Sequence, residues 1–215
     1  MKKIMLSTAL VLLFSANAVA AEILTPAQEQ AQKVYEAEVA KIKSSMQKAS
    51  EHLNANYKGR GCFDMDMVKD YNTLSEGSFA LGDFDAAIAW GLRALKVQMK
   101  LLKGDDPALA DAYSDMGNKY YMHKEHPTAV LYLKKALELY EKNPKTDPLT
   151  IADTYEMIAS VFMNLDDYEQ SLDYANKCLQ LRQKHLKKED EALKRSIMNV
   201  KFLKEEVGKQ GCKHD

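Results

Sequence analysis

The sequence predicts an all-α fold in which three helix–turn–helix units stack in a row, preceded by a long N-terminal helix and followed by a C-terminal capping helix. Tyr71, Tyr113 and Tyr155 are spaced 42 residues apart, and each opens a similar stretch of chain. Small residues recur at three fixed distances behind these tyrosines: Ser75, Gly117 and Ala159, then Ala87, Ala129 and Ser171, then Ala94, Ala136 and Cys178. Each stretch holds two amphipathic helical patterns, and two helices alone are too thin to bury an apolar face. The units are therefore expected to stack on one another.

The repeat region is expected to span residues 62–188, with units at about 69–110, 111–152 and 153–188. In each unit the pattern predicts a first helix that starts near the residue before the tyrosine and runs for about thirteen residues. A break at LGDFD, HKEHP or LDDYE precedes the second helix. The links KGDDPALAD and NPKTDPLTIAD carry Asp and Pro where one helix should end and the next begin.

The C-terminal residues 189–208 are expected to form the capping helix that an open stack needs, with an apolar stripe of Ile197, Val200 and Leu203. Residues 209–215 are expected to form a flexible tail.

The N-terminal segment 21–61 is expected to be one long helix followed by a turn. Residues 26 to about 57 contain no glycine and no interior proline, which predicts a helix of about 45 Å. Its apolar residues follow a heptad-like spacing and define the N-terminal seam: Tyr35, Val39, Ile42, Met46, Ala49 and Leu53. One interpretation is that the seam packs on the first repeat, and the alternative is self-association or a partner helix.

Residues 1–20, MKKIMLSTALVLLFSANAVA, read as a secretory signal peptide. Two lysines precede a short apolar run, and Ala18, Val19 and Ala20 complete a cleavage motif. An N-terminal membrane anchor is the alternative, but the run is short for a span. We therefore expect a periplasmic or secreted protein of a Gram-negative bacterium, with no membrane span after cleavage.

Charge and motifs argue against several functions. The chain has 30 basic and 31 acidic residues, a net charge of −1, and removal of two lysines with residues 1–20 leaves −3. Nucleic-acid binding would call for a basic stripe, so no nucleic-acid partner is expected. Phosphate-binding loops and the common hydrolase and metalloprotease motifs are missing from the sequence. We predict no enzymatic activity and no cofactor, and we expect the paired acids Asp166 and Asp167 to serve a helix start.

The order of aromatic, apolar, small and alanine positions resembles the tetratricopeptide repeat (TPR) family, whose slots in the middle unit are Tyr113, Met116, Gly117, Tyr120, Ala129, Leu133 and Ala136. The 42-residue period and the linker GDDPALAD resemble the kinesin-light-chain type of repeat. Ser78 replaces the aromatic residue of the first helix, and Gly91 stands where a large apolar residue is usual, so the first unit is the least typical. The resemblance covers residues 69–187 and implies a short right-handed α-solenoid.

The resemblance also implies a groove, lined by the first helices, that binds a peptide or helix of a protein partner. Carried over slot by slot, the groove residues are Asn72, Glu76, Phe79, Ser114, Asn118, Tyr121, Met122, Glu156, Ser160, Met163 and Asn164. This set contains no Arg or Lys, and Glu76 and Glu156, with Asp111 and Asp153, favour a neutral or basic partner. As an alternative, the long N-terminal helix or the cap covers the apolar groove residues. The function expected is a non-enzymatic scaffold or adaptor of the cell envelope.

The three cysteines suggest an alternative function for the protein. Cys178 occupies a small slot and is expected to be a buried structural thiol. Cys62 and Cys212 flank the repeats and are candidates for a disulfide or for reactive thiols. With His214 they define the alternative function, a small metal-binding or redox-active periplasmic protein.

The stretch HKEHP contains two of the five histidines, with the spacing of a metal half-site. At the 42-residue offset, however, His126 stands where Phe84 and Tyr168 stand. We therefore expect HKEHP to be the turn of the middle unit, with His126 in the aromatic slot that packs over it. No metal site is predicted there.

Overall fold

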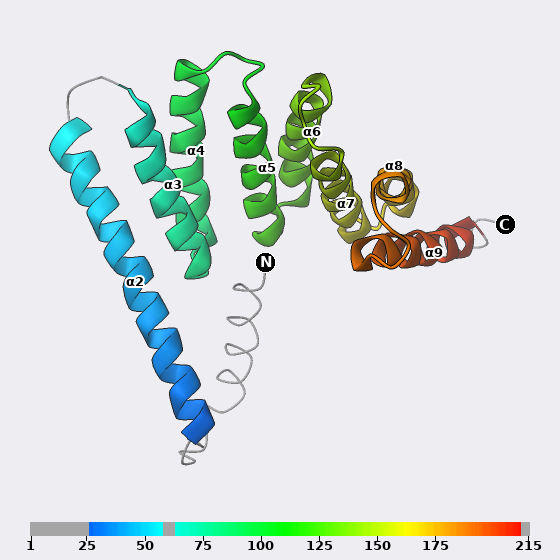
Figure 1. Cartoon of the computed structure of the whole chain (residues 1–215), viewed down its shortest axis with the longest axis horizontal. Coiled ribbons are helices and arrows are strands. Elements are labelled where there is room, and N and C mark those ends of the chain that lie inside the picture. The colour runs from blue at the N-terminus through cyan, green and yellow to red at the C-terminus, as the bar shows by residue number, and fades with distance from the viewer. Residues whose placement is uncertain (1–25, 58–62, 212–215) are drawn as a thin grey trace.

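The computed structural model describes residues 26–57 and 63–211, and every regular element in these ranges is an α-helix. The helices, labelled in Figure 1, are α2 (Pro26–Tyr57), α3 (Met65–Ala80), α4 (Phe84–Leu101), α5 (Pro107–Met122), α6 (His126–Lys142), α7 (Pro148–Asn164), α8 (Tyr168–His185) and α9 (Glu191–Gly211). The predicted signal peptide lies outside the described residues. None of the described helices combines the length and apolar character that a transmembrane span requires.

The helices form a solenoid of three hairpins, α3–α4, α5–α6 and α7–α8, that follow one another from one end of the molecule to the other (Figure 1). Helix α2 packs on α3 at one end, and α9 packs on α8 at the other. The predicted all-α solenoid is confirmed.

The first helix of each unit begins earlier than the apolar pattern predicts. Helices α3, α5 and α7 start six or seven residues before the aligned tyrosines, at Met65, Pro107 and Pro148. In α5 and α7 the preceding aspartate accepts a hydrogen bond from a backbone N–H of the first turn, and proline occupies a position whose N–H needs no partner. The aspartate cap and the proline therefore set the first residue of these two helices. The apolar pattern begins several residues later and so predicts a start that is too late.

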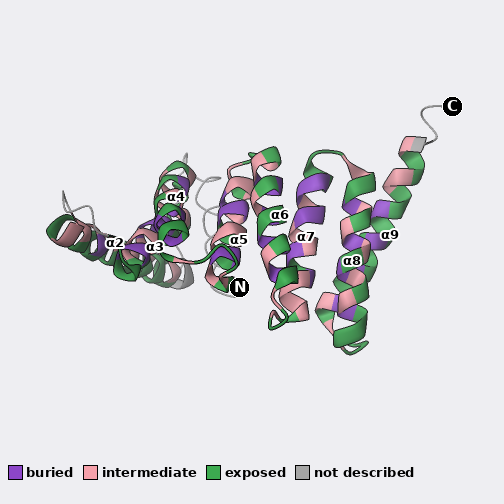
Figure 2. Cartoon of the chain, turned by 90° about the horizontal axis from the view of Figure 1, so that it is seen from above, coloured by how far each residue is buried: buried purple, intermediate pink, exposed green. Residues whose placement is uncertain are grey.

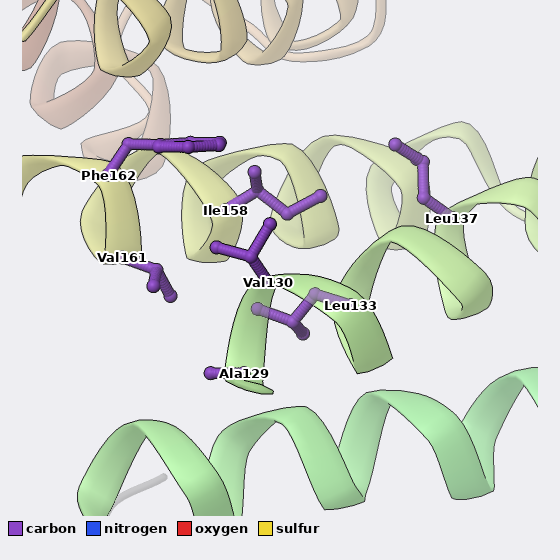
Figure 3. Packing of buried hydrophobic residues seen from close by; sticks show 7 residues of the cluster. All are labelled: Ala129, Val130, Leu133, Leu137, Ile158, Val161 and Phe162. Atoms are coloured by element: carbon purple, nitrogen blue, oxygen red, sulfur yellow. The ribbon is translucent and has the colours of Figure 1, made fainter. Parts of the chain in front are cut away.

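Small residues let the two helices of each unit approach closely. A Cβ added to Gly117 would lie 2.6 Å from Cγ of Leu133, so only glycine fits between α5 and α6. In the first unit the hydroxyl of Ser75 donates to the carbonyl oxygen of Ala87 at 2.7 Å. In the third unit Ser171 donates to Ala159 at 2.8 Å, so the same link runs in the opposite direction. Between units, Figure 3 shows Val130 of α6 beside α7 in a buried cluster of Ala129, Val130, Leu133, Leu137, Ile158, Val161 and Phe162.

The atypical Gly91 of the first unit is compensated by the second. A Cβ at Gly91 would lie 2.6 Å from Sδ of Met116, which is buried at 1% exposure. The side chain of Met116 thus occupies the space that a large residue at position 91 would fill. The missing volume is supplied by the neighbouring unit.

The N-terminal seam, which lies on α2, packs on the first repeat along its C-terminal half. Met46 and Ile42 lie against Gly77 of α3, Ala49 is buried, and Leu53 joins the cluster of Met67. The N-terminal half of α2 extends past the end of α3 (Figure 1), and Tyr35 there is exposed. The first of the two interpretations is therefore correct for the half of the seam that α3 covers, and self-association along the whole seam is not available.

Helix α9 differs from the predicted capping helix in two ways. It runs to Gly211, so residues 209–211 are helical and do not belong to a flexible tail. Its buried stripe is Leu193, Ser196, Val200 and Leu203, whereas Ile197 is 48% exposed. Figure 2 shows both buried and exposed residues along α9 at the end of the stack. Ile197 is the equivalent of Tyr155, 42 residues earlier, which packs on Tyr174 of the second helix of its unit, α8. Within the described residues no second helix follows α9, so Ile197 has no such helix to pack on.

Candidate functional site

Four of the predicted groove residues meet at one cavity of about 320 Å³, here called the groove cavity. Asn118 and Tyr121 reach it from α5, and Glu156 and Ser160 reach it from α7. The wall is completed by five residues that the groove prediction did not include: Leu133, Met157, Val161, Arg195 and Asn199. Three first-helix elements, α5, α7 and α9, therefore contribute to one site.

The remaining predicted groove residues lie apart from this cavity or at its edge. On α3 are Asn72, Glu76 and Phe79, and none of them lines the groove cavity. Phe79 packs edge-on against Phe84 at 5.4 Å between ring centroids. Ser114 and Met122 lie on α5, and Met122 is exposed. The predicted groove residues thus do not form one site: some line the groove cavity and others lie elsewhere along the solenoid.

Two further predicted residues border the groove cavity from α7. The side-chain amide of Asn164 donates to the hydroxyl of Tyr121 at 3.2 Å and links α7 to α5. Met163 lines a smaller neighbouring cavity of about 60 Å³ with Ser160 and Phe202. Met163 is 38% exposed, so neither α2 nor α9 covers it completely. The alternative that α2 or α9 covers the apolar groove residues therefore does not hold for Met122, and α9 covers Met163 only in part.

Glu156 is held in an ion-pair network, contrary to the expectation that it is free to attract a basic partner. Its carboxylate accepts hydrogen bonds from both terminal nitrogens of Arg182, at 3.0 and 2.8 Å. Arg182 is 2% exposed and also donates to Asp153 at 2.7 Å and to Ser196 of α9 at 2.7 Å. Arg195 adds a longer contact, 3.4 Å from its Nε to Glu156. Arg182 and Arg195 therefore offset the charges of Asp153 and Glu156 within the chain.

The pKa values of this pair move in the directions that mutual stabilisation requires. Burial by itself would raise the pKa of Glu156, but the hydrogen bonds and charge of Arg182, helped by Arg195, outweigh burial and lower it. Burial would likewise lower the pKa of Arg182, but its bonds to Glu156 and Asp153 raise it. Both groups stay charged, and their charges largely cancel beside the groove cavity.

The acid of the second unit is also engaged. Asp111 accepts a hydrogen bond of 2.7 Å from the hydroxyl of Tyr140. Burial, followed by this bond, raises the pKa of Tyr140. The argument for a basic partner therefore fails at Asp153 and Glu156, whose charges are offset by Arg182, whereas Asp111 accepts a hydrogen bond from a neutral hydroxyl and keeps its charge.

Sequence reasoning missed the basic residues near the site. Arg195 lies on a helix that was interpreted only as a cap, although the 42-residue register continues into it and marks it as a fourth first helix. Arg182 lies in the second helix of the third unit, on the same face as Cys178 one turn before it. Lys119 of α5 is 2% exposed and pairs with Asp115 one turn earlier. A buried cation cannot be told from a solvated one by spacing alone.

The first three residues of HKEHP form the turn between α5 and α6, and His126 and Pro127 begin α6. The ring of His126 packs on that of Tyr121 at 5.6 Å between centroids, so it occupies the aromatic slot. His123 Nε2 lies 3.1 Å from Asp85 of the first unit, and His123 Nδ1 lies 3.2 Å from Glu125. No group of three or more metal-ligand side chains occurs within residues 26–57 and 63–211.

The cysteine predictions have different outcomes. Cys178 is 2% exposed, burial raises the pKa of its thiol, and Sγ lies 3.7 Å from the hydroxyl of Ser196. It is a buried structural thiol, as predicted. Cys62, Cys212 and His214 lie outside the described residues, as does any disulfide or metal site that they form. Asp167 caps α8 by accepting from the backbone N–H of Gln170 at 3.0 Å, which confirms its predicted role at a helix start.

Comparisons with known proteins agree with this architecture. Models of the tetratricopeptide repeat match residues 71–142 and residues 152–185. No curated protein matches the chain significantly by sequence.

Three solved structures share the fold at low sequence identity. Kinesin light chain TPR-like repeats of Podosopora anserina superpose with a TM-score of 0.68 at 11% identity, over 88% of this chain and 91% of theirs. BtubC (BKLC) of P. vanneervenii superposes with a TM-score of 0.62 at 13% identity, over 80% of this chain and 84% of its own. The TPR2AB domain of yeast Sti1, in complex with pHSP90, gives a TM-score of 0.53 at 16% identity, over 70% of this chain and 51% of its own. With the repeat models matched and the solenoid formed, the chain belongs to the tetratricopeptide repeat family, with repeats like those of kinesin light chains.

Proposed function

We propose that this protein is a non-enzymatic interaction module of the bacterial cell envelope, which binds an extended segment of a protein partner at the groove cavity. The observation that carries the proposal is the convergence of polar side chains from α5, α7 and α9 on one cavity of about 320 Å³. Nothing in this set pairs a nucleophile with a base, whereas hydrogen-bond donors and acceptors are abundant.

The chemistry of the wall suits a peptide backbone. Asn118 and Asn199 each offer an amide donor and acceptor, and Ser160 and Tyr121 offer hydroxyl groups. Leu133, Met157 and Val161 supply apolar surface between them. An extended peptide presents alternating N–H and C=O groups with side chains between, and this mixed wall can satisfy both.

The charge of the site favours a segment with little net charge. Glu156 is neutralised by Arg182, and Arg195 is the remaining cation on the wall, with 58% of its side chain exposed. The two cations Arg182 and Arg195 are thus matched by the two acids Asp153 and Glu156. We therefore expect a neutral, polar segment, in place of the basic partner that unpaired acids would have attracted.

The envelope location rests on residues 1–20, whose order of lysines, apolar run and small residues is that of a cleavable signal. Mass measurement of the protein recovered from the periplasm tests it. We expect the mature chain to begin at Ala21, and recovery of the full-length chain from the cytoplasm would contradict the location.

The groove is tested by site-specific photocrosslinking in intact cells. A photoreactive phenylalanine analogue replaces Tyr121 at the cavity, and the same analogue replaces Lys96, an exposed residue of α4, as the control. We expect a protein adduct from position 121 that is absent from position 96, and that Asn118→Ala weakens. Equal adducts from both positions would argue against the groove.

A further inference from the structure

An exposed face of α9 carries a second seam, two of whose residues, Arg195 and Phe202, also line the groove cavity and its smaller neighbour. Opposite the buried residues Leu193, Val200 and Leu203, six residues recur at alternating intervals of four and three, the spacing of a two-helix coiled coil. This α9 seam consists of Glu191, Arg195, Met198, Phe202, Glu205 and Lys209. Its two central residues are large and apolar, and Met198 is 70% and Phe202 47% exposed.

An exposed apolar centre is unusual for the last helix of a solenoid. Terminal units normally present a polar outer face, because the next repeat is missing and water takes its place. The predicted role of α9 as a solvating cap fits its ends, which are charged, but does not fit Met198 and Phe202. Met198 and the exposed part of Phe202 leave an apolar surface available to a partner.

When two copies of the α9 seam are placed antiparallel, the residues that face one another are complementary. In two antiparallel copies related by a two-fold axis at Val200, Met198 of one copy faces Phe202 of the other. Arg195 then faces Glu205, and Glu191 faces Lys209, so both flanking layers pair opposite charges. We propose that α9 pairs antiparallel with α9 of a second copy of this chain, forming a two-fold symmetric dimer.

A parallel pairing is excluded by the same residues. In register, it would place Arg195 against Arg195, Glu205 against Glu205 and Lys209 against Lys209, and like charges across an interface repel one another. The antiparallel arrangement removes every one of these repulsions. The order of charges along α9 thus favours a second copy of the same helix as the partner, in the antiparallel orientation.

The charged residues of the α9 seam are free to exchange partners. Lys194 pairs with Glu191 at 2.7 Å and Lys209 with Glu206 at 2.6 Å, both one turn apart on the exposed surface, where such pairs contribute little. Arg195 contacts Glu156 only through Nε at 3.4 Å, which leaves its two terminal nitrogens for Glu205 of the second copy. Because Arg195 also lines the groove cavity, the two groove cavities of a dimer would border the same interface.

Charge reversal tests the pairing directly in the full mature chain. Sedimentation equilibrium over a dilution series is expected to show a wild-type dimer that dissociates more readily as salt is added. Arg195→Glu and Glu205→Arg each place like charges opposite one another and are expected to raise the dimer dissociation constant about tenfold or more. The matched control is Lys204→Glu, an exposed residue of α9 on the side away from the seam, which should leave the constant unchanged.

Mixing the two variants gives the sharper result. A copy with Arg195→Glu has acids at both positions and a copy with Glu205→Arg has bases at both, so an equimolar mixture is expected to form heterodimers while each variant alone is monomeric. The double variant R195E/E205R is expected to recover the homodimer. Circular dichroism checks that each variant is folded, and Glu205→Arg keeps the test valid if Arg195→Glu disturbs Glu156.

A wild-type chain that stays monomeric at about 100 μM, well above the dissociation constants of ordinary specific dimers, would overturn the proposal. So would a dimer that both charge reversals leave unchanged, because its interface would then lie elsewhere. A mixture that forms no heterodimer would exclude the antiparallel register.

Discussion

Arg182 and Glu156 form a two-pronged ion pair that joins α8 to α7 beside the groove cavity, with N–O distances of 3.0 and 2.8 Å. The same guanidinium donates to Ser196 and to the carbonyl oxygen of Ala192, both on α9. One buried side chain therefore connects the last three helices. It positions α9, and with it Arg195 and Asn199, against the groove cavity.

Arg182→Met is expected to lower the free energy of unfolding by about 3–5 kcal/mol, because it leaves Glu156 without its buried cation. Urea denaturation of both proteins measures the difference. Lys142→Met is the control, since its pair with Glu138 at 2.5 Å is exposed on both sides and should contribute little to stability. Equal losses for the two variants would show that Arg182 does not connect the helices.

The stability of the protein should fall in acid partly through Glu156. Its folded-state pKa is lowered from the ordinary 4.5, so its ionised form adds stability that is complete above that value and disappears as the pH falls through the lowered one. The free-energy difference between wild type and Glu156→Gln is therefore expected to be largest near neutral pH and to shrink below pH 4.5. Glu76→Gln, on the exposed surface of α3, controls for the lost charge. A difference that stays constant with pH would contradict this origin.

Gly117→Ala is expected to destabilise the protein by about 1–3 kcal/mol by forcing α5 and α6 apart. The new Cβ would lie 2.6 Å from Cγ of Leu133 and 3.2 Å from its backbone nitrogen, and a backbone atom cannot rotate away. Gly208→Ala is a matched helical control, because nothing lies within 4 Å of its Cβ. It should stabilise α9 by about 0.5–1 kcal/mol through helix propensity. Thermal unfolding of the two variants should therefore shift in opposite directions.

His126→Phe is expected to raise the free energy of unfolding by about 1 kcal/mol. The Nδ1 atom of His126 is buried and has no hydrogen-bond partner within the described chain, while Phe84 occupies the same position in the first unit. Phenylalanine keeps the packing on Tyr121 and removes the unsatisfied nitrogen. A loss of stability on urea denaturation would show that the imidazole has a polar partner.

Lys124→Gly is expected to stabilise the same turn by about 1 kcal/mol, since Lys124 has a φ of 64°, in the left-handed region. The equivalent residue of the first unit is Gly82, with a φ of 81°, where no added Cβ would meet a neighbour within 4 Å. Gly82→Ala should therefore lower the free energy of unfolding by about as much as Lys124→Gly raises it, because only the backbone conformation is affected. Thermal melts of both variants measure the pair, and changes of the same sign would contradict the explanation.

Repeat number, helix pairing and the packing of small residues could be read from the sequence. The spacing of Tyr71, Tyr113 and Tyr155 is local information, and the close approach at Gly117 follows from residue size. The aromatic role of His126 came from the same register. The helix starts were misplaced because an Asp–Pro cap decides where a helix begins, and apolar periodicity carries no sign of the cap.

By itself, the sequence determined an all-α repeat protein and the residues that its first helices present to a groove, since periodicity and side-chain size act between near neighbours. Only the tertiary structure decided which of those residues meet, that Glu156 is paired with Arg182, and that Arg195 and Asn199 belong to the same wall. These facts depend on contacts between residues 26 or more positions apart, such as the bond from Arg182 to Glu156. The free energy of a charge depends on what is packed around it, and that environment exists only after the units have stacked.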